Sequence, residues 1–575
     1  MGGSRRPSAA SASKRPRRSA KGSAGAGMPP STDNRWPAAR GRSAPAASAL
    51  MLVVSLAATA VTFSGVLGHR FTNWDDDRYV VNNRTIRTLD PGTVRAVFSR
   101  PFDGTYGPLV MLSFAVDYHL SGLDSGAFHL TNLVLHLANT ALVFWMVMLW
   151  DRRAVTAFVT SLAFGVHPLH VEPVAWVTAR KDLLCAFFFL ISMVAYCRFL
   201  TVRHRSRAYV VSFVAFVLAA LSKVVAVTAP AVLLLFDAVS GRRDLRKALI
   251  EKAPFVAVAV PLGIVNVLAQ RAVGASEATH AFTLIDRLLM SCYLLVFYTV
   301  KTVAPVGLSA LYMYPDAAGR HLPLEFLVAP VAAAVLLAGF WLMARRSRVV
   351  LLGGGFFLIN ILPVLQIVPV GIALAADRFA YLPSVGILFL FGAAAASLGA
   401  RTAGRAWPRR ALAGGVLMIG LALGVASWRR TEVWRDSLAL WDSVLAVDPG
   451  CPVALGNRGS ALIERGDYRG ALVDLERARA LTPGFPPIYW GLGEVAGNEG
   501  QFDRAVRLFS EAIRLDPGYA AAYYKRGVAL YWMKRYPEAL DDVVRASALG
   551  YHVHPDLMAR LRRAQGGAPR PDSNR

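Results

Sequence analysis

Charged residues and cysteines are scarce in this chain. Only 17% of its 575 residues are charged and 55% are hydrophobic, which argues against an ordinary soluble protein. The four cysteines include no C-x-x-C pair, and three of them, Cys185, Cys197 and Cys292, lie in apolar segments. This spacing gives no basis for a disulfide framework or a thiolate metal site. Acidic residues are also fewer than basic ones, 37 against 63.

Long apolar runs occupy most of the chain between residues 49 and 427. Runs of roughly 17–25 apolar residues can cross a bilayer as helices. The first run, 49–67, is interpreted as a retained helix because no A-x-A cleavage site follows it. The other expected helices lie near 130–150, 155–171, 182–200, 208–221, 224–237, 253–270, 323–343, 349–370, 383–399 and 411–427. The run 285–303 is apolar but ambiguous.

The basic residues predict how the chain crosses the membrane. Residues 1–46 hold ten Lys or Arg and one acid, and their Ser-, Ala-, Gly- and Pro-rich composition predicts disorder. We interpret this segment as a cytoplasmic tail beside anionic lipid, not as a nucleic-acid-binding arm. The later Arg clusters fall on the same side only if 285–303 is interfacial or re-entrant. The prediction is therefore about eleven spans, with the loop 69–129 and the C-terminal region outside.

A repeat follows Trp428, where the composition becomes that of a soluble helical protein. Three sets of residues recur with a spacing of 34: Pro449, Pro483 and Pro517; Gly459, Gly493 and Gly527; and Ala471, Ala505 and Ala539. This period is that of the tetratricopeptide repeat, a helix–turn–helix unit. The Gly and Ala allow the two helices to approach closely, and the Pro ends the second helix. Such units stack into a concave surface that binds peptides.

The first outer loop begins with an acidic stretch, FTNWDDDRYVVNN, residues 71–83. Asp75, Asp76 and Asp77 lie close to the end of the first apolar run, between Trp74 and Tyr79, which are typical interfacial aromatics. A solvated loop is one interpretation. A carboxylate at this boundary can also act as general base for a hydroxyl acceptor. Two adjacent carboxylates can alternatively hold a divalent cation.

A second polar stretch is HPLHVEPVAWVTARKD, residues 167–182. His167, His170 and Glu172 are residue types that bind zinc. Pro168 and Pro173 interrupt the helical geometry of a zinc-binding helix, and no further ligand is evident. The sequence therefore assigns no metal here.

Charged residues also lie at the ends of several apolar runs. Arg180 and Asp182 precede the run near 182–200, Lys223 follows "LS" between two runs, and Arg378 lies in "ADRFAYLPS". Interfacial snorkelling is the simpler interpretation of Arg180. For Lys223 an interfacial lysine and a phosphate partner are both open, because a lysine in apolar sequence is costly and suggests a function. Arg378 is a second candidate partner for an anion. The predicted topology places all four on the outer side with the acids. This arrangement fits a lipid phosphate held by cations beside a carboxylate base.

These stretches, in this order and followed by these repeats, resemble the transmembrane and tetratricopeptide-repeat-containing O-mannosyltransferases of the C-type glycosyltransferase superfamily. The resemblance extends over about residues 49–560. "WDDDRY" is similar to the superfamily's first-loop motif, which aligns the acidic pair with Asp75 and Asp76 and its Arg and Tyr with Arg78 and Tyr79. The His-Pro-x-His stretch that ends in Arg180 and Asp182 matches as well, and so do the stretches that contain Lys223 and Arg378. The resemblance implies a supporting role in the site for Arg78, Tyr79, His167, His170 and Glu172.

The resemblance implies transfer of a sugar, for this family mannose, from a polyprenyl-phosphate donor to a protein hydroxyl on the outer face. It implies that Asp75 deprotonates the acceptor, with support from Asp76, and that the cations steady the leaving lipid phosphate. The repeats would present a protein acceptor. The chain departs from the family pattern at Gly107, where Arg is usual, and at Val224, where Glu is usual. Its composition suggests a prokaryotic relative.

The sequence therefore predicts an all-α, multi-pass membrane protein with a C-type glycosyltransferase-like region followed by a tetratricopeptide solenoid. The expected parts are a basic cytoplasmic tail, a membrane region, about three repeats outside the membrane and a disordered C-terminal tail, at 1–46, 47–428, 429–560 and 561–575. In a prokaryote the membrane would be the cell membrane. A non-enzymatic repeat scaffold and a transporter are the alternatives. No cofactor is assigned apart from the lipid-linked sugar, and a divalent cation is left open.

Overall fold

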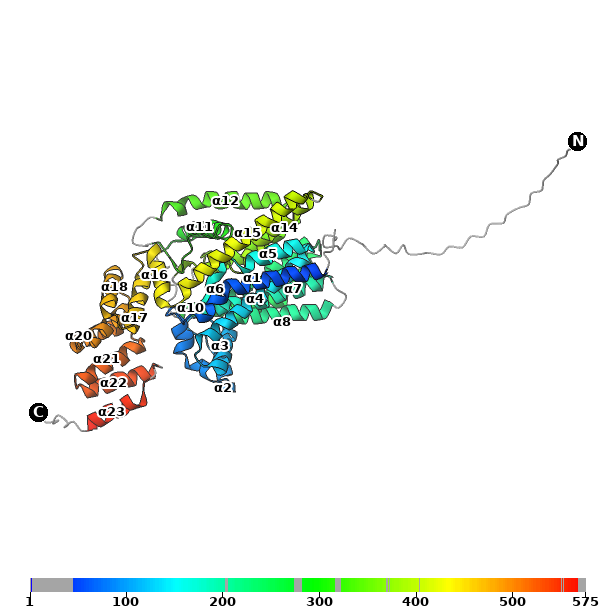
Figure 1. The fold of residues 1–575 in the computed structure, drawn as a ribbon. Coiled ribbons are helices and arrows are strands. Elements are labelled where there is room, and N and C mark those ends of the chain that lie inside the picture. The colour runs from blue at the N-terminus through cyan, green and yellow to red at the C-terminus, as the bar shows by residue number, and fades with distance from the viewer. Residues whose placement is uncertain are drawn as a thin grey trace, which may run out of the picture.

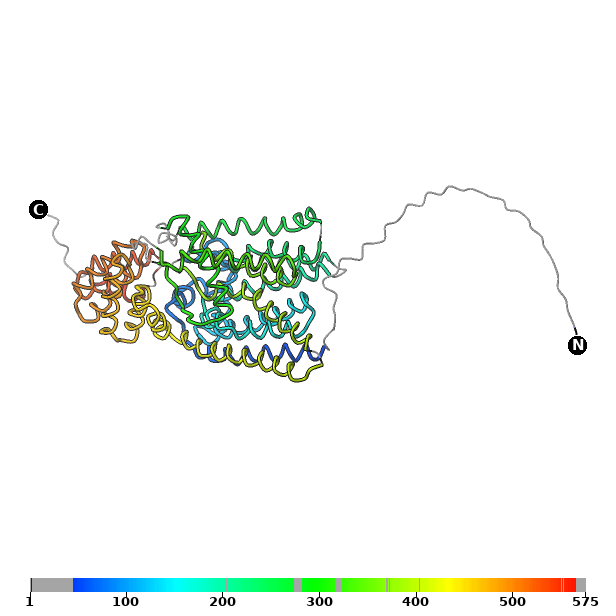
Figure 2. The backbone as a smooth tube through the Cα atoms, turned by 90° about the horizontal axis from the view of Figure 1, so that it is seen from above, coloured from blue at the N-terminus to red at the C-terminus, as the bar shows by residue number. Residues whose placement is uncertain are grey.

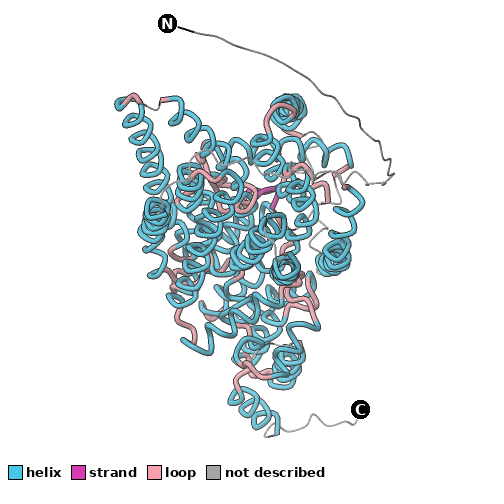
Figure 3. Tube along the Cα trace, turned by 90° about the vertical axis from the view of Figure 1, so that its right-hand side faces the viewer, coloured by secondary structure: helices cyan, strands magenta, loops and turns pink. Residues whose placement is uncertain are grey.

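The fold is almost entirely helical, as predicted. The computed structural model describes residues 2, 45–201, 205–242, 244–272, 282–315, 322–368, 371, 373–402, 404–549, 551 and 553–566. The predicted disordered tails, 1–46 and 561–575, lie outside this description except for residues 2, 45–46 and 561–566. Within the described ranges the only strands are β1 (Tyr312–Met313) and β2 (Ala373–Ala375), which pair antiparallel (Figure 3).

Eight of the described helices are long and apolar enough to cross a membrane. They are α1 (Pro45–Phe63), α4 (Ser125–Asp151), α7 (Arg180–Thr201), α8 (Arg205–Ser222), α10 (Leu245–Ala272), α12 (Leu324–Ala344), α14 (Ser384–Arg401) and α15 (Ala406–Thr431). The pair formed by α5 (Ala154–Gly165) and the segment Pro168–Ala175, which contains α6 (Val171–Ala175), is bent by 53°; it is either a ninth, broken span or a re-entrant loop. The chain is therefore an integral, multi-pass membrane protein.

Two shorter apolar segments of the membrane region would have to cross as well for the number of spans to reach the predicted eleven. Val224–Val239 contains α9 (Ala229–Val239), and Arg348–Val364 contains α13 (Arg348–Ile361). Helix α11 (Leu284–Val303), the ambiguous run, is not among the eight. The count of eleven spans requires both short segments to cross and α11 not to, and it stays a prediction.

The long helices lie roughly side by side in a bundle (Figure 1). Seen from above, α12 and α15 lie at opposite edges of this bundle (Figure 2). The most apolar windows of these two helices are only 17% and 6% buried within the chain. Their outward side chains are mostly apolar, among them Leu327, Val331, Leu417 and Leu421. This is the surface that lipid contact requires.

One end of the bundle carries the connections that build the site. The first loop folds into η2 (Asp77–Val81), η3 (Arg84–Arg87), α2 (Pro91–Ser99) and α3 (Pro108–Ser121). In Figure 1 these elements and the repeats lie at one end, whereas the turns between α4 and α5 and between α14 and α15 lie at the other. The basic residues Arg152 and Arg153 are in the first of those turns. This distribution supports the proposed orientation, with the repeats outside.

The C-terminal region is a stack of helix pairs. After η10 (Glu432–Trp434) come α16 (Ser437–Val447), α17 (Pro452–Glu464), α18 (Tyr468–Leu481), α19 (Pro486–Asn498), α20 (Phe502–Leu515), α21 (Ala520–Trp532), α22 (Tyr536–Ala548) and α23 (Pro555–Gly566). Pro449, Pro483 and Pro517 each lie two residues after a helix end, at Val447, Leu481 and Leu515. The predicted helix ends are therefore confirmed.

The repeat glycines serve close helix packing. A Cβ atom at Gly459 would lie 2.7 Å from the Leu475 side chain, and one at Gly493 would lie 2.6 Å from that of Phe509. Any larger residue would push the two helices of a unit apart. The predicted reason for the glycine period is therefore confirmed.

Candidate active site

The acidic turn, residues 73–78, has an unusual backbone. Asp75 has φ of +74°, in the left-handed region that side chains rarely adopt and that Asn and Asp tolerate best. Its carbonyl oxygen accepts hydrogen bonds from the backbone N–H of Arg78 (3.0 Å) and of Tyr79 (2.9 Å). Such a conformation persists only where the surroundings hold it. The residues on both sides of Asp75 supply that hold.

Asp76 ties the turn to the segment before α7. One carboxylate oxygen accepts from the backbone N–H (3.0 Å) and hydroxyl (3.1 Å) of Thr72. The other accepts from the backbone N–H (2.9 Å) and hydroxyl (2.6 Å) of Thr178. Asp76 is 1% exposed, and this burial raises its pKa to about 7. Both oxygens are therefore already engaged, and Asp76 holds the turn in place.

Asp75 presents the open carboxylate of the turn. Its side chain is partly exposed and makes no hydrogen bond or ion pair with any residue that the structure describes. The ionised groups that it influences include Lys181, Arg378 and Asp103. Of the predicted acidic pair, Asp75 is thus the member that an acceptor hydroxyl can reach.

The predicted supporting residues of the turn fasten it to the rest of the first loop. Arg78 forms a surface ion pair with Asp103 at 3.1 Å. The Tyr79 hydroxyl lies 2.7 Å from the Thr105 hydroxyl, and the Tyr79 ring packs edge to face on Phe102 with ring centroids 4.9 Å apart. Burial raises the pKa of Asp77, and the neighbouring Asp75 raises it further.

Arg180 and its two successors begin α7 and point to different places, because successive helical residues are about 100° apart around the axis. Arg180 is fully buried and pairs with Asp117 at 2.5 Å. It also donates to the Asn132 side chain and to the Phe128 carbonyl oxygen, each at 2.8 Å. The structure thus places the predicted phosphate ligand Arg180 in a paired cluster inside the bundle, away from the pocket described next.

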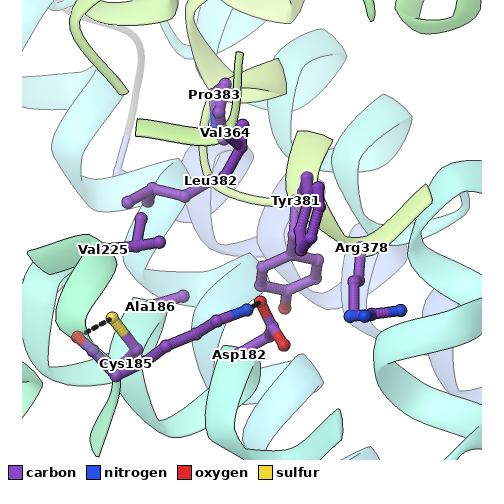
Figure 4. Close-up of a pocket in the computed structure, with 11 residues that line it drawn as sticks. Asp182, Cys185, Ala186, Val225, Val364, Arg378, Tyr381, Leu382 and Pro383 are labelled. Atoms are coloured by element: carbon purple, nitrogen blue, oxygen red, sulfur yellow. Dashed lines mark hydrogen bonds and ion pairs between the residues drawn. The ribbon is translucent and has the colours of Figure 1, made fainter. Parts of the chain in front are cut away.

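Asp182, Lys223 and Arg378 come together as predicted, around one small pocket (Figure 4). Asp182 and Lys223 form an ion pair of 2.5 Å, and Tyr381 stands between this pair and Arg378 in the view. The pocket is otherwise lined by apolar side chains such as Val225, Val364 and Leu382. Asp182 Oδ2 and Arg378 Nε have no hydrogen-bond partner among the described residues. The pocket therefore combines charge, incomplete pairing and an apolar wall.

Glu172 positions Arg378. The fully buried Glu172 carboxylate forms an ion pair with the Arg378 guanidinium and accepts its backbone N–H at 2.8 Å. The guanidinium also lies over the rings of Trp176 (5.1 Å) and Phe379 (5.0 Å). The predicted supporting acid and the predicted phosphate ligand thus form one unit.

The two predicted histidines are structural in their contacts. His167 Nε2 bonds the Thr302 carbonyl oxygen (3.1 Å), and its Nδ1 accepts from the Leu169 N–H (3.2 Å). His170 bonds the Phe164 carbonyl oxygen (2.7 Å) and the Ser384 hydroxyl (3.1 Å). Neither ring keeps a free nitrogen for a ligand. Their bonds tie the His-Pro-x-His stretch to Thr302, Phe164 and Ser384.

Asp377, next to Arg378, anchors the pocket loop to the last membrane helix. It accepts from the Tyr312 hydroxyl (2.9 Å) and pairs with Arg430 (2.7 Å) near the end of α15. Burial raises the pKa of Asp377 to about 6, although the charge of Arg430 opposes this shift. The loop carrying Arg378 is thereby fixed on both sides.

The repeats contact the acidic turn directly. Trp176 donates its indole N–H to the Trp74 carbonyl oxygen (2.7 Å) and stacks on Trp434 with centroids 5.7 Å apart. Trp74 meets Trp441 of α16 edge to face at 5.1 Å. The Asn73 side-chain oxygen accepts from the Trp441 indole N–H at 2.6 Å. A tryptophan cluster, Trp74, Trp176, Trp434 and Trp441, therefore joins the turn to the repeats.

This contact continues onto the repeat helices. The Asn73 amide donates to the Asn457 carbonyl oxygen of α17 at 2.8 Å. Burial and then the charge of Asp77 raise the pKa of Glu464, at the end of α17. Burial likewise raises the pKa of Tyr519, and the charges of Arg78 and Asp77 act on it. The repeat stack thus lies beside the acidic turn.

Sequence reasoning missed four residues of this arrangement. Lys181 stands between two predicted residues in the Ala-Arg-Lys-Asp stretch, and its position there was a usable signal. Asp117, Tyr312 and Arg430 carry no motif, and each pairs with a residue at least 50 positions away. Only the fold reveals these three partners.

Known proteins are similar to this chain in the repeats and over most of its length. The tetratricopeptide repeat family matches residues 421–485 and 491–550, so the predicted repeats are confirmed. The chain is 25% identical over 517 residues to Protein O-mannosyl-transferase F38B6.6 of Caenorhabditis elegans, covering 84% of this chain and 65% of that protein. It is 27% identical over 475 residues to Protein O-mannosyl-transferase TMTC4 of Mus musculus, covering 69% and 62%. The predicted resemblance to these O-mannosyl-transferases is thereby confirmed.

A shorter match is closer in sequence. The chain is 35% identical over 138 residues to Protein O-mannosyl-transferase TMTC1 of Mus musculus, covering 22% of this chain and 14% of that protein. All three matches span less than two thirds of the relative's length. Among solved structures, ArnT from Cupriavidus metallidurans bound to undecaprenyl phosphate is 16% identical, with a TM-score of 0.37 and coverage of 83% of this chain and 81% of that one.

Proposed function

We propose that this relative of the protein O-mannosyl-transferases is an integral-membrane glycosyltransferase. It transfers a sugar, mannose as the first candidate, from a polyprenyl-phosphate donor to a hydroxyl of a protein acceptor on the extracytoplasmic face. The observation that carries the proposal is the open Asp75 carboxylate at the end of a membrane helix, close enough to Arg378 of the charged pocket for their charges to interact. A lipid-borne donor and a water-borne acceptor can meet at such a boundary.

Asp75 acts as the general base. It takes the proton of the acceptor hydroxyl while the acceptor oxygen forms a bond to the anomeric carbon of the sugar. The bond between that carbon and the phosphate oxygen breaks, and its electron pair leaves with the polyprenyl phosphate. The proton on Asp75 then passes to water on the outer side. Asp76 keeps Asp75 in its left-handed backbone conformation through its bonds to Thr72 and Thr178.

The charged pocket receives the phosphate end of the donor. Arg378, held by Glu172, and Lys223, held by Asp182, supply positive charge where the leaving group becomes more negative. The apolar wall formed by Val225, Val364 and Leu382 suits the first part of a polyprenyl chain. Arg180 contributes from outside the pocket by fixing the start of α7.

The repeats bind the acceptor protein. Their first two helices, α16 and α17, touch the acidic turn through Trp441 and Asn457. A polypeptide bound on the repeat surface would therefore pass within reach of Asp75. The membrane lipid and the lipid-linked sugar complete the set of expected partners, and no nucleic acid is among them.

A transfer assay tests this function. Membranes containing the protein are incubated with radiolabelled polyprenyl-phosphate sugars, polyprenyl-phosphate mannose among them, and label in endogenous protein is counted. We expect transfer with at least one donor by wild type and background transfer by Asp75→Asn at matched expression. No transfer from any donor by wild type would contradict the proposal and favour the non-enzymatic scaffold.

A further inference from the structure

Four basic residues of the site differ in how their charge is balanced. Three have a carboxylate partner: Arg180 pairs with Asp117, Lys223 with Asp182 and Arg378 with Glu172. Lys181 makes neither an ion pair nor a hydrogen bond with any residue that the structure describes. A half-buried cation without an anionic partner is costly. A bound ligand can supply the negative charge that Lys181 lacks within the protein.

Lys181 is held in place without being neutralised. Its ammonium lies over the Tyr79 ring at 5.5 Å and over the Trp176 ring at 5.4 Å, distances at which a cation is attracted to an aromatic face. Tyr79 is fixed in turn by Thr105, and Trp176 is fixed by the tryptophan cluster. Tyr79 and Trp176 therefore fix the position of the Lys181 ammonium.

The surroundings of Lys181 place it between the base and the pocket. The charged groups that act on it are Asp75 of the acidic turn together with Asp182, Lys223 and Arg378 of the pocket. The two carboxylates among them differ, because Asp182 is already paired with Lys223 whereas Asp75 is open. The Lys181 ammonium is thus within electrostatic reach both of the open carboxylate and of the charged residues of the pocket.

We propose that the Lys181 ammonium binds the phosphate of the lipid-linked donor and balances the charge that develops on it during transfer. This inference rests on the proposed function. The ligand class is a phosphate ester, as a diester in the donor and as a monoester in the leaving lipid phosphate. When the bond between the anomeric carbon and the phosphate oxygen breaks, the bonding electrons stay on that oxygen, and the phosphate changes from one negative charge towards two.

This change in charge decides which step Lys181 affects. A cation attracts the developing dianion more strongly than the diester, so it stabilises the transition state more than the bound donor. Loss of the lysine should then lower kcat more than it raises KM for the donor. It should also weaken inhibition by the product, polyprenyl phosphate.

The test uses the full-length protein in membranes or detergent with three variants. Lys181→Met removes the charge at nearly constant length, Lys181→Arg keeps it, and Lys247→Met removes an equivalent charge at an exposed position in α10. The measurements are kcat, the donor KM, and inhibition constants for polyprenyl phosphate and for inorganic phosphate. Thermal unfolding midpoints verify that each variant is folded.

We expect Lys181→Met to lower kcat about ten- to a hundredfold and to raise the polyprenyl-phosphate inhibition constant about tenfold or more. Lys181→Arg should recover most of both losses, and Lys247→Met should equal wild type. A parallel change in inhibition by inorganic phosphate would assign Lys181 to the phosphate itself. A change confined to polyprenyl phosphate would assign it to the lipid-linked form.

Two results would overturn the inference. One is a kcat and a product inhibition constant for Lys181→Met within twofold of wild type. The other is a shifted pH profile with unchanged product inhibition, which would mean that Lys181 acts on Asp75 instead. Asp75→Asn in the same preparations separates the failures: if it abolishes transfer while Lys181→Met is normal, only the inference falls. If wild type transfers nothing, the proposed function falls with it.

Discussion

The repeats and the end of the membrane region that carries the acidic turn balance their charges in different ways. In the repeats, Arg458 holds both oxygens of Asp474 at 2.7 and 2.8 Å. Arg526, 68 positions and thus two periods later, holds both oxygens of Asp542 at 2.7 Å each. Each of these pairs joins the two helices of one repeat. Their pairing is complete and serves the fold.

Pairing at this end of the membrane region is incomplete. The Asp75 carboxylate and the Lys181 ammonium have no hydrogen-bond or ion-pair partner among the described residues. Asp182 Oδ2 and Arg378 Nε, each in a residue that forms an ion pair, also lack a hydrogen-bond partner there. Buried polar groups are normally satisfied. Under the proposed function, these unsatisfied groups are the ones left to contact the donor and the acceptor.

The largest expected effect is on the open carboxylate. Asp75→Asn removes the base but keeps a side chain that tolerates a left-handed backbone, and it breaks no hydrogen bond in the described structure. We expect transfer to fall by about 10²–10⁴-fold with an unchanged thermal unfolding midpoint. Asp103→Asn, which breaks only the surface pair with Arg78, is the matched control. Equal losses in the two variants would contradict a special role for Asp75.

The next largest expected effect is on the stability, through the buried ion pair of Glu172 and Arg378. Glu172→Gln leaves the Arg378 guanidinium without its counter-charge, and breaking such a pair costs about 3–5 kcal/mol. We expect the free energy of unfolding to fall by that amount, as measured by denaturant titration in detergent. Arg78→Gln, at an exposed pair, is the control and should change it by less than about 1 kcal/mol. Similar losses would mean that burial does not distinguish the two pairs.

The raised pKa of Asp76 predicts that the stability of the protein depends on pH. Burial raises its pKa from 3.8 to about 7, so the folded state holds the proton more tightly than the unfolded state does. The stability that this preference contributes is complete below about pH 4 and is lost as the pH rises through 7. At about 1.4 kcal/mol per pKa unit, the interval from 3.8 to about 7 corresponds to about 4 kcal/mol at most.

The measurement is the thermal unfolding midpoint at pH 5 and pH 8, followed by tryptophan fluorescence. Wild type should lose more stability over this interval than Asp76→Asn, which cannot ionise. Parallel pH curves for the two proteins would show that Asp76 does not titrate as the structure implies.

The smallest expected effect is in the repeats. Asp474→Asn replaces one of the oxygens that Arg458 contacts, and it should cost about 1–3 kcal/mol of unfolding free energy. Transfer per folded molecule should stay unchanged, because the Arg458 side chain bonds Asp474 and Asp442 and no residue of the acidic turn. Hydrogen exchange of α17 and α18 would localise the loss. A fall in transfer would mean that the repeat pairs also serve the reaction.

Local patterns in the sequence predicted the elements and part of the site. The 34-residue period predicted the packing of Gly459 on Leu475, because a period reports which positions of a unit face each other. Hydropathy predicted the long helices. The ends of apolar runs predicted that Asp182, Lys223 and Arg378 lie on one face, and the structure brings these three together.

The remaining features depend on contacts between distant segments. Arg180 and Lys181 are adjacent in sequence, yet one is paired inside the bundle and the other is open towards Asp75, since helix rotation separates them. The partner of Arg180, Asp117, lies 63 positions earlier. Asn73 and Trp441 are 368 positions apart. No local pattern specifies such pairs, so the contact between the repeats and the acidic turn could not be predicted.

One paired measurement tests most directly whether incomplete pairing marks the site. Transfer rate and unfolding midpoint are measured together for Asp75→Asn and Asp474→Asn, at matched expression in the same membranes. The account predicts opposite outcomes: Asp75→Asn loses transfer and keeps its stability, whereas Asp474→Asn loses stability and keeps its transfer. If both variants lose transfer only in proportion to stability, the open carboxylate is a structural residue and the central claim is wrong.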